Sequence, residues 1–489
     1  MKSSKKLYRL KVLIHIAISS FFFNGCGLNS HSVNIESIPI EIPKYWSTSI
    51  HSNDSLVGDW HSIFDEPEFE DFIILLKKNS IDLQTIVYDQ KIAYYGSLIK
   101  QPRIFPSINS NAGLDTNMQN LAGFGFADSF LEDSDDSDNS GIINFGSTNV
   151  SFGINFQWEV DIWGNLLNAR KASLKDYESI NYNLNYLGFS LLVRASQIYF
   201  DAVEASMQLK LAEESYTSFV EISNFVKTRY EKGLKSSLDY RLSQATVSNS
   251  KIILENRKIQ LKNINRKIET MLGLYPTGNF IKAYNLPNYL LDIDIGIPAD
   301  LLLRRPDIKA LFLNAESAGL RLAEAKRNRL PRISLSGNVG TSSNSLDDIF
   351  NIEHGVWNLG ANLLTPIFNG STLSNNIKLQ KINKEKAKKD LISGLLKAFS
   401  EVEKILDYDN SLNVQIQAIN LAVEESSDVL SLSKQRYDKG LLPLDFVLNS
   451  QASYNSIRSQ KLSLTNKNIK NRLSLILAIG GEFIPIKKD

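Results

Sequence analysis

Apolar residues recur with two different periods along this chain, and the two periods follow one another. Over residues 150–160, which read VSFGINFQWEV, every second residue is apolar, and this alternation predicts a β-strand. Over residues 184–230 the spacing changes to three and four, which predicts one long α-helix with a coiled-coil seam. Because residues 165–232 contain no proline, this helix can reach on the order of 100 Å at about 1.5 Å per residue.

The second half of the chain repeats this order of patterns. Alternating segments predict two pairs of strands, at residues 105–115 with 150–161 and at residues 333–339 with 357–363. After the second pair, a Pro-free segment over residues 367–442 carries a second helical seam, which Asp409 and Ser426 interrupt. An acidic loop without an apolar pattern separates the first two strands.

Each long helical segment ends in the same short motif. Residues 229–234 read RYEKGL and residues 436–441 read RYDKGL, and an amphipathic segment follows each copy. Glycine after a basic helical run is a common helix stop, because it adopts the left-handed C-cap conformation without steric cost. Each motif therefore predicts the tip of a helical hairpin. The flanking residues differ between the two copies, so we expect the tips to share a fold and to differ in role.

Residue offsets indicate that the chain contains two internal structural repeats. Arg229 and Arg436 are 207 positions apart, and the two helical seams keep that offset. Before the strands, Phe105-Pro106 and Leu330-Pro331 are 225 positions apart, and the acidic loop accounts for the difference. We expect the first repeat at residues 61–273, a linker at 274–298, the second repeat at 299–482 and a tail at 483–489.

The N-terminus has the features of an export signal. Residues 1–25 combine a basic start with an apolar run, and the only cysteine, Cys26, follows directly. This arrangement resembles the bacterial lipoprotein signal, in which the cysteine is diacylglycerol-modified; the alternative is an ordinary signal peptide with an incidental cysteine. We expect a lipidated, extended segment over residues 26–60.

Composition excludes several classes of protein. The formal net charge of +1 gives no reason to expect a nucleic acid partner. Five histidines without zinc-like spacing predict no metal site. The chain lacks a nucleophile motif and a phosphate-binding loop, so we expect neither an enzyme nor a cofactor.

Several longer motifs resemble those of the bacterial outer membrane efflux channel family. WHSIFDEPEFEDFIILLKKNSIDL resembles its first-helix signature, QWEVDIWGNLLNAR its strand-to-helix junction, and LLLRRPDI its most distinctive motif. Within the last motif, Arg304, Arg305 and Asp307 open a predicted helix, where Pro and Asp are favoured, so we interpret them as structural. The resemblance covers nearly the whole mature chain and includes the two tips.

The resemblance implies a mainly α fold with a β-barrel portion. Four strands from each subunit of a homotrimer would form a twelve-stranded outer membrane β-barrel, continued by a long α-helical coiled-coil tunnel in the periplasm. The protein would be the lipid-anchored exit duct of a tripartite, multidrug-type efflux system. Its partners would be a periplasmic adaptor (membrane fusion) protein and an inner membrane transporter of the resistance-nodulation-division (RND) type.

The resemblance also suggests candidate gate residues, since the family's tips converge to close the periplasmic end. Asp239 and Asp445 lie where acidic residues constrict the channel, and Asn449 stands where many members have Asp. Arg229 and Arg436 are candidate partners of these acids. The alternative is that the aspartates are N-cap residues of the return helices. The candidate adaptor-docking residues are Gly233, Leu234, Gly440 and Leu441.

Two alternative functions stay open at this point. A protein-exporting channel of type I secretion would share the channel fold, although the lipoprotein signal and LLLRRPDI favour efflux. A soluble periplasmic coiled-coil adaptor would explain the hairpins. It would not require the fully apolar strand faces of residues 150–160 and 357–363.

Overall fold

The structure is a computed structural model, and it describes most of the chain between residues 43 and 480. The described residues are 43–47, 60, 64, 66–102, 104–120, 144–281, 285–287, 298 and 304–480, without the side chains of residues 120 and 144. The expected signal peptide, Cys26 and the tail lie outside the described residues. So do most of the expected lipidated segment and part of the expected linker.

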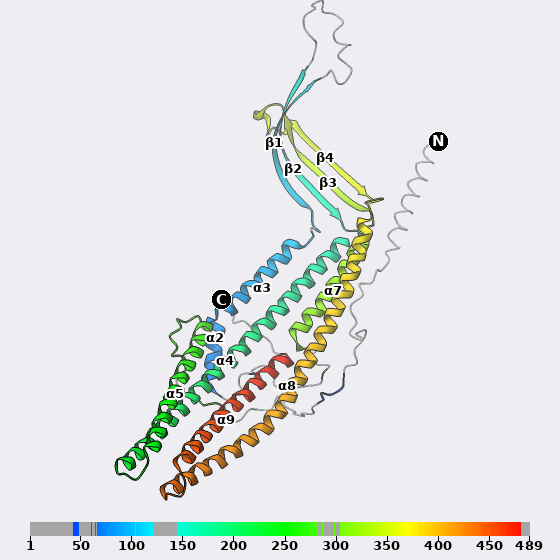
Figure 1. Cartoon of the computed structure of the whole chain (residues 1–489). Coiled ribbons are helices and arrows are strands. Elements are labelled where there is room, and N and C mark those ends of the chain that lie inside the picture. The colour runs from blue at the N-terminus through cyan, green and yellow to red at the C-terminus, as the bar shows by residue number, and fades with distance from the viewer. Residues whose placement is uncertain are drawn as a thin grey trace, which may run out of the picture. The chain divides into compact units, whose positions relative to one another are not determined.

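The described elements alternate between helices and strands in the predicted order (Figure 1). They are α2 (Pro67–Asn79), α3 (Ile81–Lys100), β1 (Ser107–Asn120), β2 (Asn144–Val160), α4 (Asn165–Glu231), α5 (Ser237–Met271), α7 (Pro306–Arg327), β3 (Arg332–Ser343), the short η6 (Leu346–Asp348) and η7 (Ile352–His354), β4 (Gly355–Leu364), α8 (Thr372–Asp438) and α9 (Leu444–Ile479). The predicted strand pairs and long helices are confirmed. Strands β1 and β2 extend further into the predicted loop than the alternation indicated.

Chain contacts divide the protein into two compact units, and each unit takes segments from both halves of the sequence. The first unit contains Ile99–Lys175 and Glu316–Lys386, and with them the sheet. The second contains Asp176–Ala315 and Ala387–Asp489, with most of the helical hairpins. No helix in the described part of the chain is long and apolar enough to cross a membrane.

The sheet of the first unit is an antiparallel meander with the order β1-β2-β3-β4 (Figure 1). Its two faces differ in polarity, as the alternation predicts. Ile154, Val339 and Trp357 lie opposite one another on one face and are 45%, 59% and 79% exposed. On the other face four asparagines form one row across all four strands: Asn109, Asn155, Asn338 and Asn358. The sheet therefore has an uncovered apolar face and an amide-rich face.

The main core lies in the second unit, where aromatic side chains of α2 and α4 meet. The rings of Phe69 and Phe200 lie 4.9 Å apart, and Phe72 stacks on Tyr199 at 4.9 Å. Beside α2, the buried surface of α4 is wider than the predicted seam. Seam residues such as Ala195 are buried, but so are residues on its other sides, among them Phe189, Leu192, Phe200 and Val203. The reason is that α2 and α9 add apolar side chains to the same core.

Candidate functional site at the helix tips

Both predicted hairpin tips end in the same backbone turn. After α4, Gly233 has φ of +69° and the Leu234 amide donates to the Arg229 carbonyl at 2.8 Å. After α8, Gly440 has φ of +73° and the Leu441 amide donates to the Arg436 carbonyl at 2.9 Å. A second bond in each turn runs from the glycine amide back to the tyrosine carbonyl, which completes a Schellman motif. The prediction that these glycines stop the helices is confirmed.

The candidate aspartates lie in the first turns of the return helices rather than at their N-caps. Ser236 caps α5, and its hydroxyl accepts a hydrogen bond from the Asp239 amide at 3.2 Å. Pro443 occupies the N-cap of α9, ahead of Asp445. The N-cap alternative is therefore wrong in detail. Both acids nevertheless sit where the helix dipole favours a negative charge.

A tyrosine of the second hairpin (α8 and α9) is held by side chains of the first hairpin (α4 and α5). Tyr437, only 3% exposed, meets the Phe225 ring of α4 at 6.3 Å. The Arg229 guanidinium lies 4.2 Å from the Phe225 ring centroid and 6.0 Å from that of Tyr437. The Lys235 ammonium lies 4.4 Å from the Tyr437 centroid. These residues, together with Asp239, form what we call the tip cluster.

The electrostatics of the tip cluster centre on the Tyr437 hydroxyl. Burial raises the pKa of Tyr437, the Asp239 carboxylate raises that pKa further, and Arg229 opposes both effects. Within the described residues the buried hydroxyl oxygen has no hydrogen-bond partner. A buried, unpaired polar group costs about 1–3 kcal/mol. The apolar and cation–π contacts around the ring offset that cost in this arrangement.

An apolar patch joins the two hairpins around the tip cluster. Phe219 and Val226 of α4 pack with Tyr437 of α8 and with residues of the first turns of α9, namely Leu444, Val447 and Leu448. Because Tyr437 belongs both to this patch and to the tip cluster, separation of the two hairpins here would expose apolar surface and release the cations together.

The other candidate residues of the two tips face solvent. Asp445, Asn449 and Arg436 are exposed, and so are Leu234 and Leu441, at 68% and 69%. Among the described residues, no ion pair joins Asp239 or Asp445 to Arg229 or Arg436. The structure thus brings Arg229 and Asp239 together around Tyr437 and leaves Asp445, Asn449 and Arg436 apart from them.

Sequence reasoning placed Tyr437 and Lys235 at the tips, but it missed Phe225 and did not predict that these three residues meet. The tyrosine of the first motif, Tyr230, behaves differently: it stacks on Tyr240 of its own hairpin at 5.5 Å and is 40% exposed. The one available signal was the difference after the glycines, since Lys235 has an apolar residue, Leu442, as its counterpart. At this position, therefore, only the first tip carries a cation.

Farther from the tips, polar side chains join α4 to α9 in a row that we call the α4–α9 ladder. The Lys470 ammonium lies 3.0 Å from Asp201 Oδ1. The other members follow along both helices in antiparallel order: Asn466 donates to Glu204 at 2.7 Å, Ser459 to Gln208 at 2.7 Å, and Asn455 to Ser215 at 2.7 Å. The ladder sets the register of α4 against α9. It does so through polar side-chain contacts, and water can take the place of either partner in each of them.

The sequence motif at the start of α7 has a structural role, as interpreted. The Arg305 guanidinium is 2% exposed and donates to both Asp307 oxygens, to Glu401 of α8 at 2.8 Å, and to the Ala478 carbonyl of α9 at 3.2 Å. It therefore ties three helices at one point. Burial lowers its pKa, but the hydrogen bonds and charges of Asp307 and Glu401 outweigh this effect, so the net pKa is raised and the charge is permanent.

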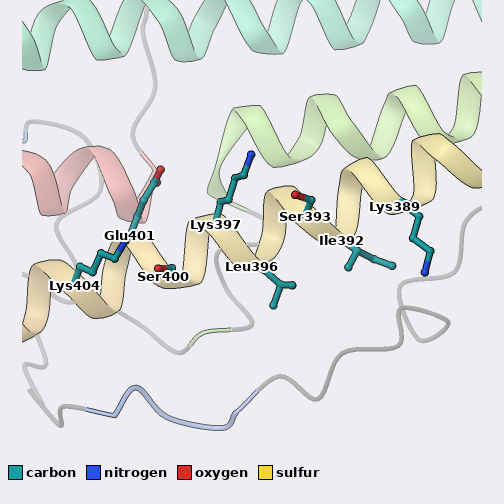
Figure 2. A pocket seen from close by; sticks show the side chains of 8 residues that line it. All are labelled: Lys389, Ile392, Ser393, Leu396, Lys397, Ser400, Glu401 and Lys404. Carbon is teal, nitrogen blue, oxygen red and sulfur yellow. The ribbon is translucent and has the colours of Figure 1, made fainter.

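A shallow hollow on α8 lies beside this anchor. Figure 2 shows that all its lining side chains come from this one helix, with Lys397 and Glu401 on one side and Ile392 and Leu396 on the other. It is an open helix face rather than a closed site. Within the described residues, no group of three or more metal-ligating side chains could hold an ion.

Comparison with known proteins gives one consistent result. A sequence model of the family described as outer membrane efflux protein matches residues 75–274 and 297–481. The cation efflux system protein CusC of Escherichia coli is 25% identical over 68% of this chain and 72% of its own length. The probable outer membrane lipoprotein SilC of Salmonella typhimurium is 22% identical over 98% of this chain and 100% of its own. The outer membrane channel CmeC of Campylobacter jejuni has a TM-score of 0.81 and 20% identity, over 93% of this chain and 95% of that structure.

Proposed function

The chain belongs to the outer membrane efflux protein family, and we propose that it serves as the exit duct of a tripartite efflux system whose helix tips form a gate. Family membership makes it an outer membrane transport protein, so the alternative of a soluble adaptor is wrong. The proposed partners are a periplasmic adaptor and an inner membrane pump of the RND type.

The sheet supports a homotrimeric barrel. Strands β1 and β4 end the sheet order, so each has one side without a partner strand in this chain. Lipid does not tolerate unpaired strand edges. Three copies joined edge to edge would give twelve strands, with the face of Trp357 towards lipid and the asparagine row towards an aqueous lumen.

The two hairpins support the proposal of internal repeats. Helices α4 and α8 have 67 residues each, start 207 positions apart and end 207 positions apart. They terminate in equivalent Schellman turns. A duplicated hairpin whose two copies then diverged at Lys235 and Tyr437 accounts for both the likeness and the difference.

The gate proposal rests on one observation, which is the capture of Tyr437 by the first hairpin. While Tyr437 lies against Phe225, Arg229 and Lys235, the second hairpin is fastened to the first. Opening would withdraw the tyrosine and let the second hairpin move outward. No covalent bond is made or broken, so opening depends on the stability of this contact and of the apolar patch around it.

Single-channel conductance of purified trimers in planar bilayers tests the gate. We expect Tyr437→Ala to raise the conductance several-fold, or to raise the open probability from a value near zero. The reason is that the substitution removes the ring that Arg229 and Lys235 contact. Tyr230→Ala is the matched control: it removes the equivalent tyrosine of the first tip, which stacks only within its own hairpin. An intact Tyr437→Ala trimer with wild-type conductance would contradict the proposal.

The remaining candidate residues enter the proposal in two further roles. Asp445 and Asn449, exposed on α9, would line the constriction in threefold copies, and Asp445→Ala would then reduce cation preference. Exposed Leu234 and Leu441, beside Gly233 and Gly440, would contact the adaptor. Cysteines placed at Leu234 and Leu441 would cross-link to the adaptor in cells, whereas a cysteine at exposed Glu255 would not.

Membrane attachment is proposed through Cys26. The probable lipoprotein SilC aligns along almost the whole of this chain, which supports an acylated N-terminus here. Mass spectrometry of the mature N-terminal peptide tests this directly. A peptide that begins with unmodified Cys26, or upstream of it, would exclude the lipid anchor.

A further inference from the structure

A cavity of about 350 Å³ lies among α4, α5 and α9, at the point where the apolar core of the hairpins is interrupted. Phe219 at one end belongs to the apolar patch near the tips. Gln208 at the other end follows Met207, which packs against the main core. Between them the helices present small side chains, including Ala212, Ala452 and Ser456. The cavity therefore lies between two apolar cores, and it is open to solvent where Ile253, Ala452 and Ser456 are exposed.

The polar groups around this cavity are largely occupied with one another. Gln208 and Ser459 exchange hydrogen bonds, and Asn455 donates to Ser215. The hydroxyls of Thr246 and Ser250 donate to carbonyls of their own helix. What a guest can contact is apolar surface from Leu211, Phe219 and Ile253, together with the polar side chains of Asn249, Ser456 and Gln460.

One charged side chain lines the cavity, and it is a cation. Arg257 donates from one nitrogen to Gln260 at 3.0 Å, and within the described residues no carboxylate forms an ion pair with it. The adjacent acid, Glu255, pairs with Lys258 at 2.9 Å instead. A guanidinium has five N–H donors in a planar fork that suits a carboxylate or sulfonate.

From this combination we propose that the cavity is a binding site for a small anionic amphiphile, such as a medium-chain carboxylate. The chain of the guest would fill the void between the two cores, and its head group would bind Arg257. The volume is in the range of small-molecule sites. The proposal concerns a site in the wall between helices and does not depend on the gate proposed above.

Protection of a cavity thiol against modification tests the site in the intact protein in membranes. Ser456→Cys places a thiol on the lining of the cavity, and Ser453→Cys places one on α9 outside it; both positions are exposed, so both thiols should react when no guest is bound. With decanoate below its micelle concentration, we expect N-ethylmaleimide to modify Ser456→Cys about tenfold more slowly and Ser453→Cys at an unchanged rate. Peptide mass spectrometry resolves these positions from native Cys26.

Charge selectivity tests the role of Arg257. When Arg257→Gln is added to the Ser456→Cys variant, decanoate should protect the thiol about tenfold less, since a charge-assisted hydrogen bond to the head group is lost. Arg266→Gln is the matched control. Arg266 lies on the same helix but outside the cavity, and it likewise donates one side-chain hydrogen bond, to Asn263 at 3.1 Å. Three results would each overturn the proposal. Decanoate could slow both thiols equally, decyltrimethylammonium could protect as well as decanoate, or Arg257→Gln could leave the protection unchanged.

Discussion

At the scale of single residues, the contacts of each tip tyrosine depend on the neighbouring helices rather than on the motif that contains it. Tyr230 and Tyr437 occupy the same place in two nearly identical motifs, yet one stacks within its hairpin and the other is buried against a neighbour. A sequence pattern fixes where the turn falls, because the glycine requirement is local. It does not reveal which tyrosine is captured, because the capturing residues come from a different hairpin.

Replacement of a tip glycine should loosen its turn. Gly440→Ala puts a Cβ on a backbone with φ of +73°, which costs about 1–2 kcal/mol. We expect faster amide hydrogen exchange across residues 436–444. Gly319→Ala in α7 is the control, since no atom lies within 4 Å of the added Cβ. It should leave exchange in α7 unchanged or slower, and a similar acceleration there would argue against the explanation.

Alkaline pH should weaken the tip cluster. Burial and Asp239 raise the pKa of Tyr437 above its ordinary value of 10.0, so the neutral form is favoured when the ring is held. Its stabilising contribution is complete below pH 10 and is lost as the pH rises through the raised pKa. We expect open probability to increase above about pH 10 in the wild type. Tyr437→Phe, which cannot ionise, should lack this increase.

At the scale of elements, periodicity located the helices but could not explain the breaks in their seams. Asp409 and Ser426 both interrupt the seam of α8. Asp409 is 2% exposed and lies 3.5 Å from Arg472 of α9, whereas the Ser426 hydroxyl donates to a carbonyl of its own helix. Asp409 and Ser426 differ only in whether a side chain of another helix contacts them. The partners of Asp409 lie more than 60 residues away, so the local spacing of apolar residues does not reveal them.

The two seam breaks should therefore respond oppositely to an apolar substitution. Asp409→Leu leaves Arg472 buried without its carboxylate and should cost about 3–5 kcal/mol. Ser426→Leu restores the seam at a half-buried position and should be neutral or slightly stabilising. Thermal unfolding followed by circular dichroism compares them. A stabilised Asp409→Leu variant would show that the ion pair contributes nothing to stability.

At the scale of the whole molecule, the alternation predicted strand faces correctly but could not show their cross-strand alignment. The asparagine row depends on the register of three strand pairs, which is set by turns and pairing between distant segments. The proposed trimer likewise depends on surfaces that a single chain leaves unpaired.

Substitutions on opposite faces of β4 test the proposed barrel. Leu359→Arg puts a charge on the apolar face and should cost about 2–4 kcal/mol near the membrane midplane, which would reduce assembled trimer in the outer membrane. Asn358→Arg, at the neighbouring position on the amide-rich face, should assemble normally and shift conductance towards anions. Equal assembly of both variants would contradict the assigned orientation of the sheet.

The asparagine row has a consequence for how such a duct can change over time. In the proposed homotrimer the row of four becomes a belt of twelve amides, and one codon specifies three of them. A single nucleotide change that introduces Asp or Lys therefore alters the charge of the lumen by three at once, never by one. Intermediate charge states are out of reach of point mutation, so a neutral belt can remain stable in evolution while the surrounding surface drifts.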